Sequence, residues 1–332
     1  MTEHRETFAC FGSECTVIVA GGTGAAAAVA DARRRLLDWH VQFSRFEPDS
    51  ELSRLNADPR ASVPVSSMLR RIIQSGIDAA RATEGLVDPT LVREIEQAGY
   101  DAHLEAGGRP LSEALALAPP RSPGRAHPER RWAQIRVERG AGTITRPRGV
   151  MFDPGGIAKG VFADELAARL SGHDAFVVDC GGDMRLGGRV GVKRKVHVAS
   201  PSGGSILHTL QIRAGAVATS GIGKRSWLDQ DGRPAHHLLN PATGRPAFTG
   251  VVQVTAVART AVEAESLSKA VLLSGPAAAE RMLERGGGVV VLDDGTVKVV
   301  APARPSMPDR APRSAPPTRS RRRRAPAAAQ AR

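Results

Sequence analysis

Residues 152–160, with the sequence FDPGGIAKG, join a predicted strand to a predicted helix and could hold a phosphate. The adjacent glycines Gly155 and Gly156 lack a Cβ atom and therefore let the backbone approach a ligand closely. The helix that follows offers unpaired N–H groups and the positive end of its dipole, which suit an anionic group, and Lys159 adds a point charge. A tight strand-to-helix turn without a ligand is the alternative interpretation.

A second candidate segment is 218–221 (ATSG), which precedes Lys224 and Arg225. Small hydroxyl residues beside glycine suit contacts with phosphate or ribose, and Ser220 is the candidate for such a contact. A plain turn explains the same residues equally well.

A histidine pair, His236 and His237, leads into the turn-forming run 240–246 (NPATGRP). An imidazole in an ordered turn can act as a general base, a general acid or a metal ligand. A pair of surface histidines without a chemical role is the alternative.

The predicted helix 260–274 places Glu265, Ser268 and Lys269 on one face, because they are spaced by three and four residues. Glu265 could ligate a metal ion, but Glu265 and Lys269 also have the ideal spacing for an ion pair within the helix. The polar run 43–56 contains Phe43 and Phe46, although aromatic residues make up only 4% of the chain. One of these rings could stack on a flat base, and packing in the core is the alternative.

The elements that must position these segments mix helices and strands irregularly. Apolar residues at helical spacing predict helices, and short apolar runs between turn residues predict strands. Helices are expected over residues 25–43, 66–82, 90–98, 157–170, 260–274 and 277–285, and strands over 14–20, 135–137, 143–145, 175–178, 289–292 and 297–300, with further β segments within 184–258. Residues 102–130, rich in Gly, Pro and Arg, are expected as a surface excursion. Without strict βαβ alternation, the sequence predicts an α+β fold, with a mixed-sheet, sandwich-like core and flanking helices.

Length and composition favour a globular domain over residues 1–301. The chain has 332 residues, of which 41% are hydrophobic, and no stretch approaches the roughly 20 apolar residues that span a bilayer. The N-terminus lacks the features of a signal peptide, so a cytoplasmic location is expected. Cys10, Cys15 and Cys180 are too few and too irregular for a disulfide framework, and Cys10 and Cys15 are expected to be buried.

Most of the net charge of +12 lies in residues 302–332, which carry nine Arg, one acidic residue and a net charge of +8. This tail is rich in Pro, Ala and Arg and is predicted to be disordered. A basic run of this kind could bind membrane lipid or nucleic acid weakly. A solvated tail is the simpler interpretation, so the charge does not indicate a nucleic-acid-binding protein.

Taken in order, several segments resemble the ApbE-like FAD:protein FMN transferases, from about residue 8 to about residue 300. The matching segments are FSRFEPDSELSRLN, TEGLVDPT, FDPGGIAKG, CGGD, ATSG, HHLLNPATGRP and AESLSKA, of which FDPGGIAKG and HHLLNPATGRP are the most specific. Members of this family bind FAD and Mg²⁺, cleave the pyrophosphate, release AMP, and attach FMN to Thr or Ser of an acceptor flavoprotein through a phosphoester. The resemblance implies the same activity here, on a T-fold-like architecture.

The resemblance also implies roles for individual residues. Contacts with FAD fall on Phe11, Phe46, Leu86, Val87, Asp88, Gly156, Lys159, Ser220 and His237. Phe11 stands where the family usually has a methionine against the flavin nucleotide, and Phe46 stands at an aromatic position that packs on adenine. The carbonyl of Ala158 and the side chain of Glu265 match metal ligands. His237 matches the residue expected to transfer a proton near the reacting phosphate.

Three positions depart from the family's pattern. Glu265 replaces the usual metal-binding Asp, Lys269 replaces the usual metal-binding Thr, and Asn240 stands where Asp usually precedes Pro. Glu265 still offers a hard oxygen ligand for Mg²⁺. A protonated lysine cannot ligate a cation and repels one, so either Lys269 points away from the site or it is a catalytic residue whose charge replaces part of the metal's work. An FAD-storage protein without transferase activity and an FAD pyrophosphatase are the alternative functions.

Overall fold

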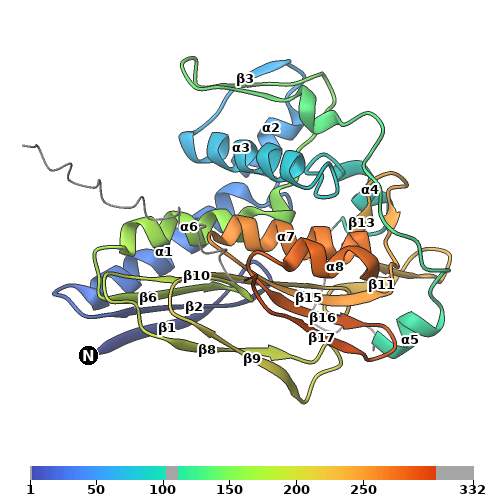
Figure 1. The fold of residues 1–332 in the computed structure, drawn as a ribbon. Helices are drawn as coiled ribbons and strands as arrows, with labels where there is room; N and C mark the ends of the chain where they lie inside the picture. The colour runs from blue at the N-terminus through green and yellow to red at the C-terminus, as the bar shows by residue number, and fades with distance from the viewer. Residues whose placement is uncertain (1, 102–110, 304–332) are drawn as a thin grey trace, which may run out of the picture.

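One large sheet organises the chain and includes both its first and its last described strands (Figure 1). In the computed structural model, which describes residues 2–101 and 111–303, each pair of neighbouring strands in this sheet is antiparallel. From edge to edge the sheet consists of β1 (Glu3–Cys10), β2 (Ser13–Ala20), β6 (Ala175–Cys180), β7 (Asp183–Gly187), β10 (Gly215–Gly221), β15 (Val251–Ala258), β16 (Gly288–Leu292) and β17 (Val297–Val300).

The α+β prediction is confirmed, and the structure defines the strand directions more closely. A mixed sheet was expected, whereas the described pairs of the large sheet are antiparallel, partly because β1–β2, β6–β7 and β16–β17 are hairpins. Four smaller antiparallel sheets accompany it: β3 (Ser62–Pro64) with β5 (Thr143–Thr145) and β4 (Arg136–Glu138), β8 (Arg194–Ala199) with β9 (Ile206–Ile212), β11 (Ser226–Leu228) with β12 (Pro234–His236), and β13 (Leu239–Asn240) with β14 (Arg245–Pro246).

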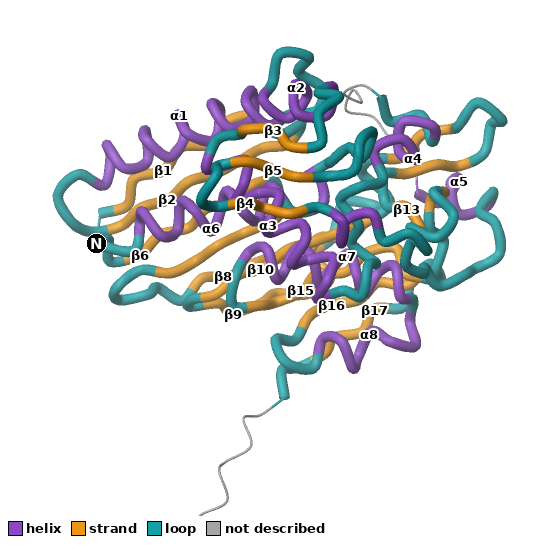
Figure 2. The backbone as a smooth tube through the Cα atoms, turned by 90° about the horizontal axis from the view of Figure 1, so that it is seen from above, coloured by secondary structure: helices purple, strands orange, loops and turns teal. Residues whose placement is uncertain are grey.

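Helices cover one face of the large sheet, and the β8–β9 ribbon covers part of the other face (Figure 1). The α-helices are α1 (Ala25–Phe43), α2 (Glu51–Ala57), α3 (Ser67–Ala82), α4 (Val92–Gln97), α5 (Leu111–Ala116), α6 (Ala158–Leu170), α7 (Ala261–Ser274) and α8 (Pro276–Leu283), with the 3₁₀ turns η1 (Arg131–Gln134) and η2 (Pro154–Gly156). Helices α1, α6 and α7 contact the sheet directly. Figures 1 and 2 place α3 and the β3–β5–β4 sheet on the far side of these helices.

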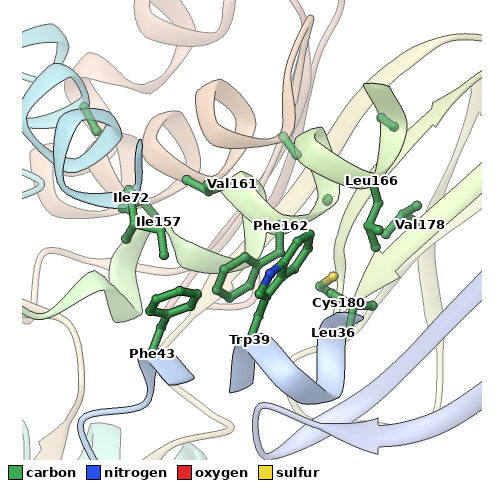
Figure 3. Packing of buried hydrophobic residues seen from close by; sticks show 14 of the residues in the cluster. Leu36, Trp39, Phe43, Ile72, Ile157, Val161, Phe162, Leu166, Val178 and Cys180 are labelled. Carbon is green, nitrogen blue, oxygen red and sulfur yellow. The ribbon is translucent and has the colours of Figure 1, made fainter. Parts of the chain in front are cut away.

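The core between helices and sheet is centred on an aromatic cluster. Phe162 of α6 is 1% exposed and stacks on Trp39 and Phe43 of α1, with ring centroids 5.2 and 6.2 Å apart (Figure 3). Phe43 therefore packs in the core, which was the alternative interpretation of this residue. By anchoring α6 to α1, the cluster fixes the position of the glycine-rich segment at the start of α6.

The predicted helices form within a few residues of their expected bounds, and two short helices were missed. Helix α2 overlaps the end of the polar run 43–56. Of its own seven residues only Leu52 and Leu55 are buried, so it shows little apolar periodicity. Helix α5 lies within the predicted surface excursion. The predicted disordered tail lies outside the described residues, apart from its first positions.

The burial expected for Cys10 and Cys15 is confirmed. Cys10, Cys15 and Cys180 are all buried and free. None of the described helices is both long enough and apolar enough to cross a membrane.

Candidate active site

Four charged side chains, three of them buried and one partly buried, meet where α6, α7 and β7 come together. The Lys159 ammonium contacts the Asp183 carboxylate, and its Nζ lies 3.9 Å from Oε1 of Glu265. The Nζ of Lys269 lies 3.0 Å from the same oxygen of Glu265. Glu265 is 0% exposed, Asp183 1% and Lys269 8%. We call Lys159, Asp183, Glu265 and Lys269 the ion cluster.

Helices α6 and α7 hold the ion cluster in place by capping each other's first turn. The Gly160 N–H of α6 donates to Oε2 of Glu265 on α7 at 2.8 Å. In return, the Ala261 and Val262 N–H groups of α7 donate to Asp164 on α6 at 2.9 and 3.0 Å. N–H groups in the first turn of a helix have no partner within the helix, and a carboxylate satisfies both their hydrogen bonding and the helix dipole. The exchange therefore fixes the Glu265 carboxylate beside the start of α6.

Burial and charge pairing act in opposite directions on the pKa values of Lys159, Glu265 and Asp183. Burial opposes the charged form of Lys159, but the Asp183 and Glu265 carboxylates raise its pKa above the ordinary value. For Glu265, burial works against ionisation, and the ammonium groups of Lys269 and Lys159 nevertheless hold its pKa below the ordinary value. Burial raises the pKa of Asp183, with Lys159 opposing the shift. Paired buried charges of this kind stabilise one another only as a set.

A divalent metal ion does not fit these donors. Both carboxylate oxygens of Glu265 are already engaged, Oε2 by the Gly160 N–H and Oε1 by Lys269. The Asp183 carboxylate, the other acid in the cluster, is bound by Lys159. Residues 2–101 and 111–303 contain no group of three or more His, Cys, Asp or Glu side chains that could hold a metal ion. Mg²⁺ requires several oxygen ligands, and two ammonium groups would repel it at this position.

The two adjacent histidines have different environments, which the sequence did not distinguish. His236 is 1% exposed and uses both ring nitrogens on backbone, since Nε2 lies 3.0 Å from the Ala247 carbonyl and Nδ1 accepts the Leu238 N–H at 3.3 Å. His237 is half-buried, and its buried Nδ1 has no hydrogen-bond partner among the described residues. Burial, followed by the nearby Arg225 guanidinium, holds the pKa of His237 well below its ordinary value. His237 is therefore a neutral imidazole with a nitrogen available for a proton.

The environment of His236 makes folding stability pH-dependent. Burial lowers the pKa of His236 from 6.5 to about 4, so between these values the unfolded chain binds the proton that the folded chain excludes. The contribution of neutral His236 to the free energy of unfolding is complete above the pKa of the unfolded chain, 6.5, and is lost as the pH falls towards the folded pKa of about 4. We expect the free energy of unfolding to drop by about 2 kcal/mol from this residue between about pH 7 and about pH 5. Urea titrations at both pH values should show a smaller drop for His236→Gln; an equal drop would contradict the assignment.

The remaining predicted FAD contacts lie in several different settings. Ser220 on β10 hydrogen-bonds Ser268 at 2.7 Å, with either hydroxyl as donor, next to the ion cluster. Val87 lies near Gly156 and Lys269, and Leu86 packs between the two larger hydrophobic clusters. Asp88 accepts two bonds from Thr90 through Oδ1, while its buried Oδ2 has no partner among the described residues.

Phe11 and Phe46 lie on different partners. Phe11 has a left-handed backbone (φ 56°), stacks on Phe162 at 5.3 Å, and its carbonyl accepts a bond from Arg225. The Phe46 ring meets Tyr100 edge-on at 5.3 Å, and the Arg45 guanidinium lies 4.2 Å from its centroid. The structure thus brings Gly156, Ala158, Lys159, Glu265 and Lys269 together, with Val87 and Ser220 beside them.

The two glycines at the start of α6 serve different purposes. A Cβ atom on Gly160 would lie 2.8 Å from the backbone of Ala261 and Val262, so this glycine permits the close approach of α6 and α7. A Cβ atom on Gly156 would lie no closer than 3.8 Å to its neighbours, Val87 and Lys269, an ordinary contact distance. A Cβ atom would therefore fit at Gly156, on the side of the turn that the side chain of Lys269 lines.

We expect Gly160→Ala to cost about 1–3 kcal/mol of folding stability, because its methyl group overpacks a helix contact. Gly156→Ala should change stability by less than about 1 kcal/mol but weaken FAD binding, because the new methyl group enters the space proposed for the pyrophosphate. Thermal melts and FAD titrations of both variants test this contrast. It is wrong if Gly156→Ala destabilises as much as Gly160→Ala.

Two residues of the site were not singled out from the sequence. Asp183 ends the CGGD segment, and its Oδ1 is buried without a partner among the described residues. Arg225 donates to the Phe11 carbonyl at 3.1 Å and acts electrostatically on both Lys159 and His237. The CGGD motif and the Lys224-Arg225 pair were the available signals, but neither identifies which side chain faces the cluster.

A cavity of about 420 Å³ lies elsewhere, between residues 115–121 and 248–252. Its charged lining residues, Arg121 and Asp293, are paired with each other at 2.6 Å. None of the residues of the ion cluster lines it, and its walls are otherwise largely apolar. We therefore place the chemistry at the ion cluster.

One protein family and several curated proteins are similar to this chain. The model of the ApbE family matches residues 11–292. The chain is 28% identical to an FAD:protein FMN transferase of Vibrio cholerae over 250 residues, covering 73% of this chain and 72% of the relative. It is 27% identical to one of Treponema pallidum over 300 residues, covering 82% and 79%.

Solved structures share the fold. The ApbE protein of Thermotoga maritima superposes with a TM-score of 0.71 at 24% identity, covering 90% of this chain and 97% of the other. The flavin transferase ApbE of Vibrio cholerae gives a TM-score of 0.69 at 22% identity, covering 90% and 97%.

Proposed function

The chain belongs to the ApbE family, and from this premise we propose that it is an FAD:protein FMN transferase. It cleaves FAD and joins FMN by a phosphoester to a Thr or Ser hydroxyl of an acceptor flavoprotein, with release of AMP. The curated relatives carry this name and match most of this chain. The observation that carries the proposal is the unpartnered Nδ1 of His237 in the field of Arg225 and Lys269.

The proposed reaction assigns a separate task to each group. The acceptor oxygen attacks the phosphorus on the FMN side of the pyrophosphate, and the bond from that phosphorus to the AMP oxygen breaks. His237 Nδ1 takes the proton that leaves the hydroxyl, as a general base. Lys159, Lys269 and Arg225 offset the negative charge that develops on the departing AMP. Positioning and electrostatics dominate, as in phosphoryl transfer generally.

The free enzyme has a neutral His237 because burial, and after it the charges of Arg225 and Lys269, lower the pKa of the imidazole. A bound pyrophosphate would supply negative charge beside these cations and favour protonation of the imidazole. The base would thus become stronger when the substrate is in place. Gly156, which lacks a Cβ atom beside Lys269, provides the approach for the pyrophosphate.

The acceptor is a flavoprotein that presents an extended hydroxyl-bearing loop to this site. We further propose that the reaction is cytoplasmic. FAD is the donor substrate. Mg²⁺, which the resemblance implies, has no fitting donor set among Ala158, Glu265 and their neighbours, and we derive no step from it.

The test combines the purified protein with FAD and an acceptor flavoprotein that a curated relative modifies. Covalent fluorescent flavin on the denatured acceptor, with one AMP released per flavin attached, supports the transferase. The control acceptor has its target Thr or Ser replaced by Ala and should stay unlabelled. FAD binding without AMP release would instead indicate a storage protein, and FMN plus AMP without any acceptor would indicate a pyrophosphatase.

A further inference from the structure

Lys269 stands at the centre of the site, where its ammonium is bound to Glu265 and its methylene carbons flank the glycine turn. We propose that Lys269 is a built-in cation of this site, so that the protein binds the FAD pyrophosphate without a divalent metal ion. The inference rests on the proposed function and deepens it by replacing the metal with a residue of the chain.

The position of the ammonium is set by the protein itself. The Glu265 carboxylate is held by the Gly160 N–H at 2.8 Å, and Lys269 Nζ lies 3.0 Å from the other oxygen of that carboxylate. The spacing of four residues along α7 brings these two side chains together. Lys269 is only 8% exposed, so its ammonium lies inside the cluster and not in solvent. The structure thus excludes the interpretation in which Lys269 points away from the site.

The ammonium lies beside the space proposed for the pyrophosphate. A Cβ atom on Gly156 would be 3.9 Å from both Cδ and Cε of Lys269. The last methylene groups of the lysine therefore line the space above the glycine turn. A phosphate oxygen entering this space would come within reach of Nζ, which has three donors and uses one on Glu265.

The local charge balance favours an anion over a cation. Lys159 and Lys269 offset the charges of Asp183 and Glu265, and Arg225 adds a further positive charge. A pyrophosphate would be attracted to this set, while a divalent cation would be repelled by the two ammonium groups that already pair with these carboxylates. The ion cluster thus supplies the positive charge that phosphate recognition requires.

The first measurement uses the unmodified full chain. FAD affinity is measured by calorimetry in the presence of excess Mg²⁺ and again in the presence of a chelator. We expect dissociation constants that agree within about threefold, less than the effect of losing one charge-assisted bond. A loss of tenfold or more in chelator would overturn the inference and leave the transferase proposal standing. An absence of FAD binding under both conditions would overturn the transferase proposal, and the inference with it.

The second measurement uses Lys269→Thr, which removes the ammonium and supplies a hydroxyl. We expect FAD binding in chelator to weaken by about tenfold to a hundredfold, as for loss of one charge-assisted bond, and Mg²⁺ to restore it. Titration of this variant with Mn²⁺ alone, followed by electron paramagnetic resonance, should reveal a metal site that the unmodified chain lacks. Equal Mn²⁺ binding by both proteins would overturn the inference.

Two further variants separate charge from folding. Lys269→Arg keeps a cation next to Glu265 and should bind FAD in chelator more tightly than Lys269→Thr. Lys195→Thr makes the same substitution at an exposed position of β8 and should behave as the unmodified chain. If Lys269→Arg and Lys269→Thr, both folded by circular dichroism, lost affinity equally, the charge of Lys269 would not be the cause and the inference would fail.

Discussion

Replacing His237 with glutamine is expected to slow FMN transfer by roughly 10²- to 10⁴-fold, the usual contribution of a general base. The Nδ1 of His237 is buried without a hydrogen-bond partner in the described part of the chain. The low pKa of the imidazole keeps the ring neutral at neutral pH. Glutamine retains polarity and approximate size but cannot take up the proton of the acceptor hydroxyl. FAD affinity should change by less than about tenfold, because the cations that hold the pyrophosphate remain.

The rate is measured by fluorescence of the acceptor under single-turnover conditions, with FAD affinity measured separately. His236→Gln is the matched control, since it makes the same substitution one residue earlier, where the imidazole bonds only to backbone. At neutral pH it should keep most of the transfer rate. If the His237→Gln variant transferred FMN at a rate within tenfold of the unmodified protein, His237 would not be the general base of the proposed mechanism.

Replacing Glu265 with glutamine is expected to lower the free energy of unfolding by about 3–5 kcal/mol, the usual cost of breaking a buried ion pair on one side. The amide oxygen can still accept the Gly160 N–H, so the capping of α6 is kept. The lost charge leaves Lys269 with no carboxylate partner and Lys159 with Asp183 alone. The melting temperature should fall by on the order of 10 °C.

Thermal and urea unfolding test this expectation, and α7 provides a close control. Glu263 is exposed and belongs to the capping box at the start of the same helix. Glutamine serves equally at that position of a capping box, so Glu263→Gln should cost less than about 0.5 kcal/mol. The double variant Glu265→Gln with Lys269→Met should recover part of the loss, since removal of both charges avoids an unpaired buried ion. Equal stability of Glu265→Gln and Glu263→Gln would show that the ion cluster does not stabilise the fold.

The sequence alone determined the elements that depend on local patterns. Helix α3 was predicted from Met68, Ile72, Ile73 and Ile77 at helical spacing; the three isoleucines are buried and Met68 is partly buried. The ion pair between Glu265 and Lys269 followed from a spacing of four residues on one helix. The order of short segments identified the family, which the match over residues 11–292 confirms.

Only the tertiary structure decided how the site is assembled, because its contacts join segments far apart in the chain. Glu265 binds the backbone of Gly160 on another helix, and Lys159 pairs with Asp183 on a strand. Such contacts depend on helix packing and strand register, and no periodicity in the sequence encodes them. The difference between His236 and His237 arises from burial and backbone partners, which two adjacent identical residues cannot reveal. The sequence therefore specified which charges are present, while the packing of α6 against α7 decided which of them meet.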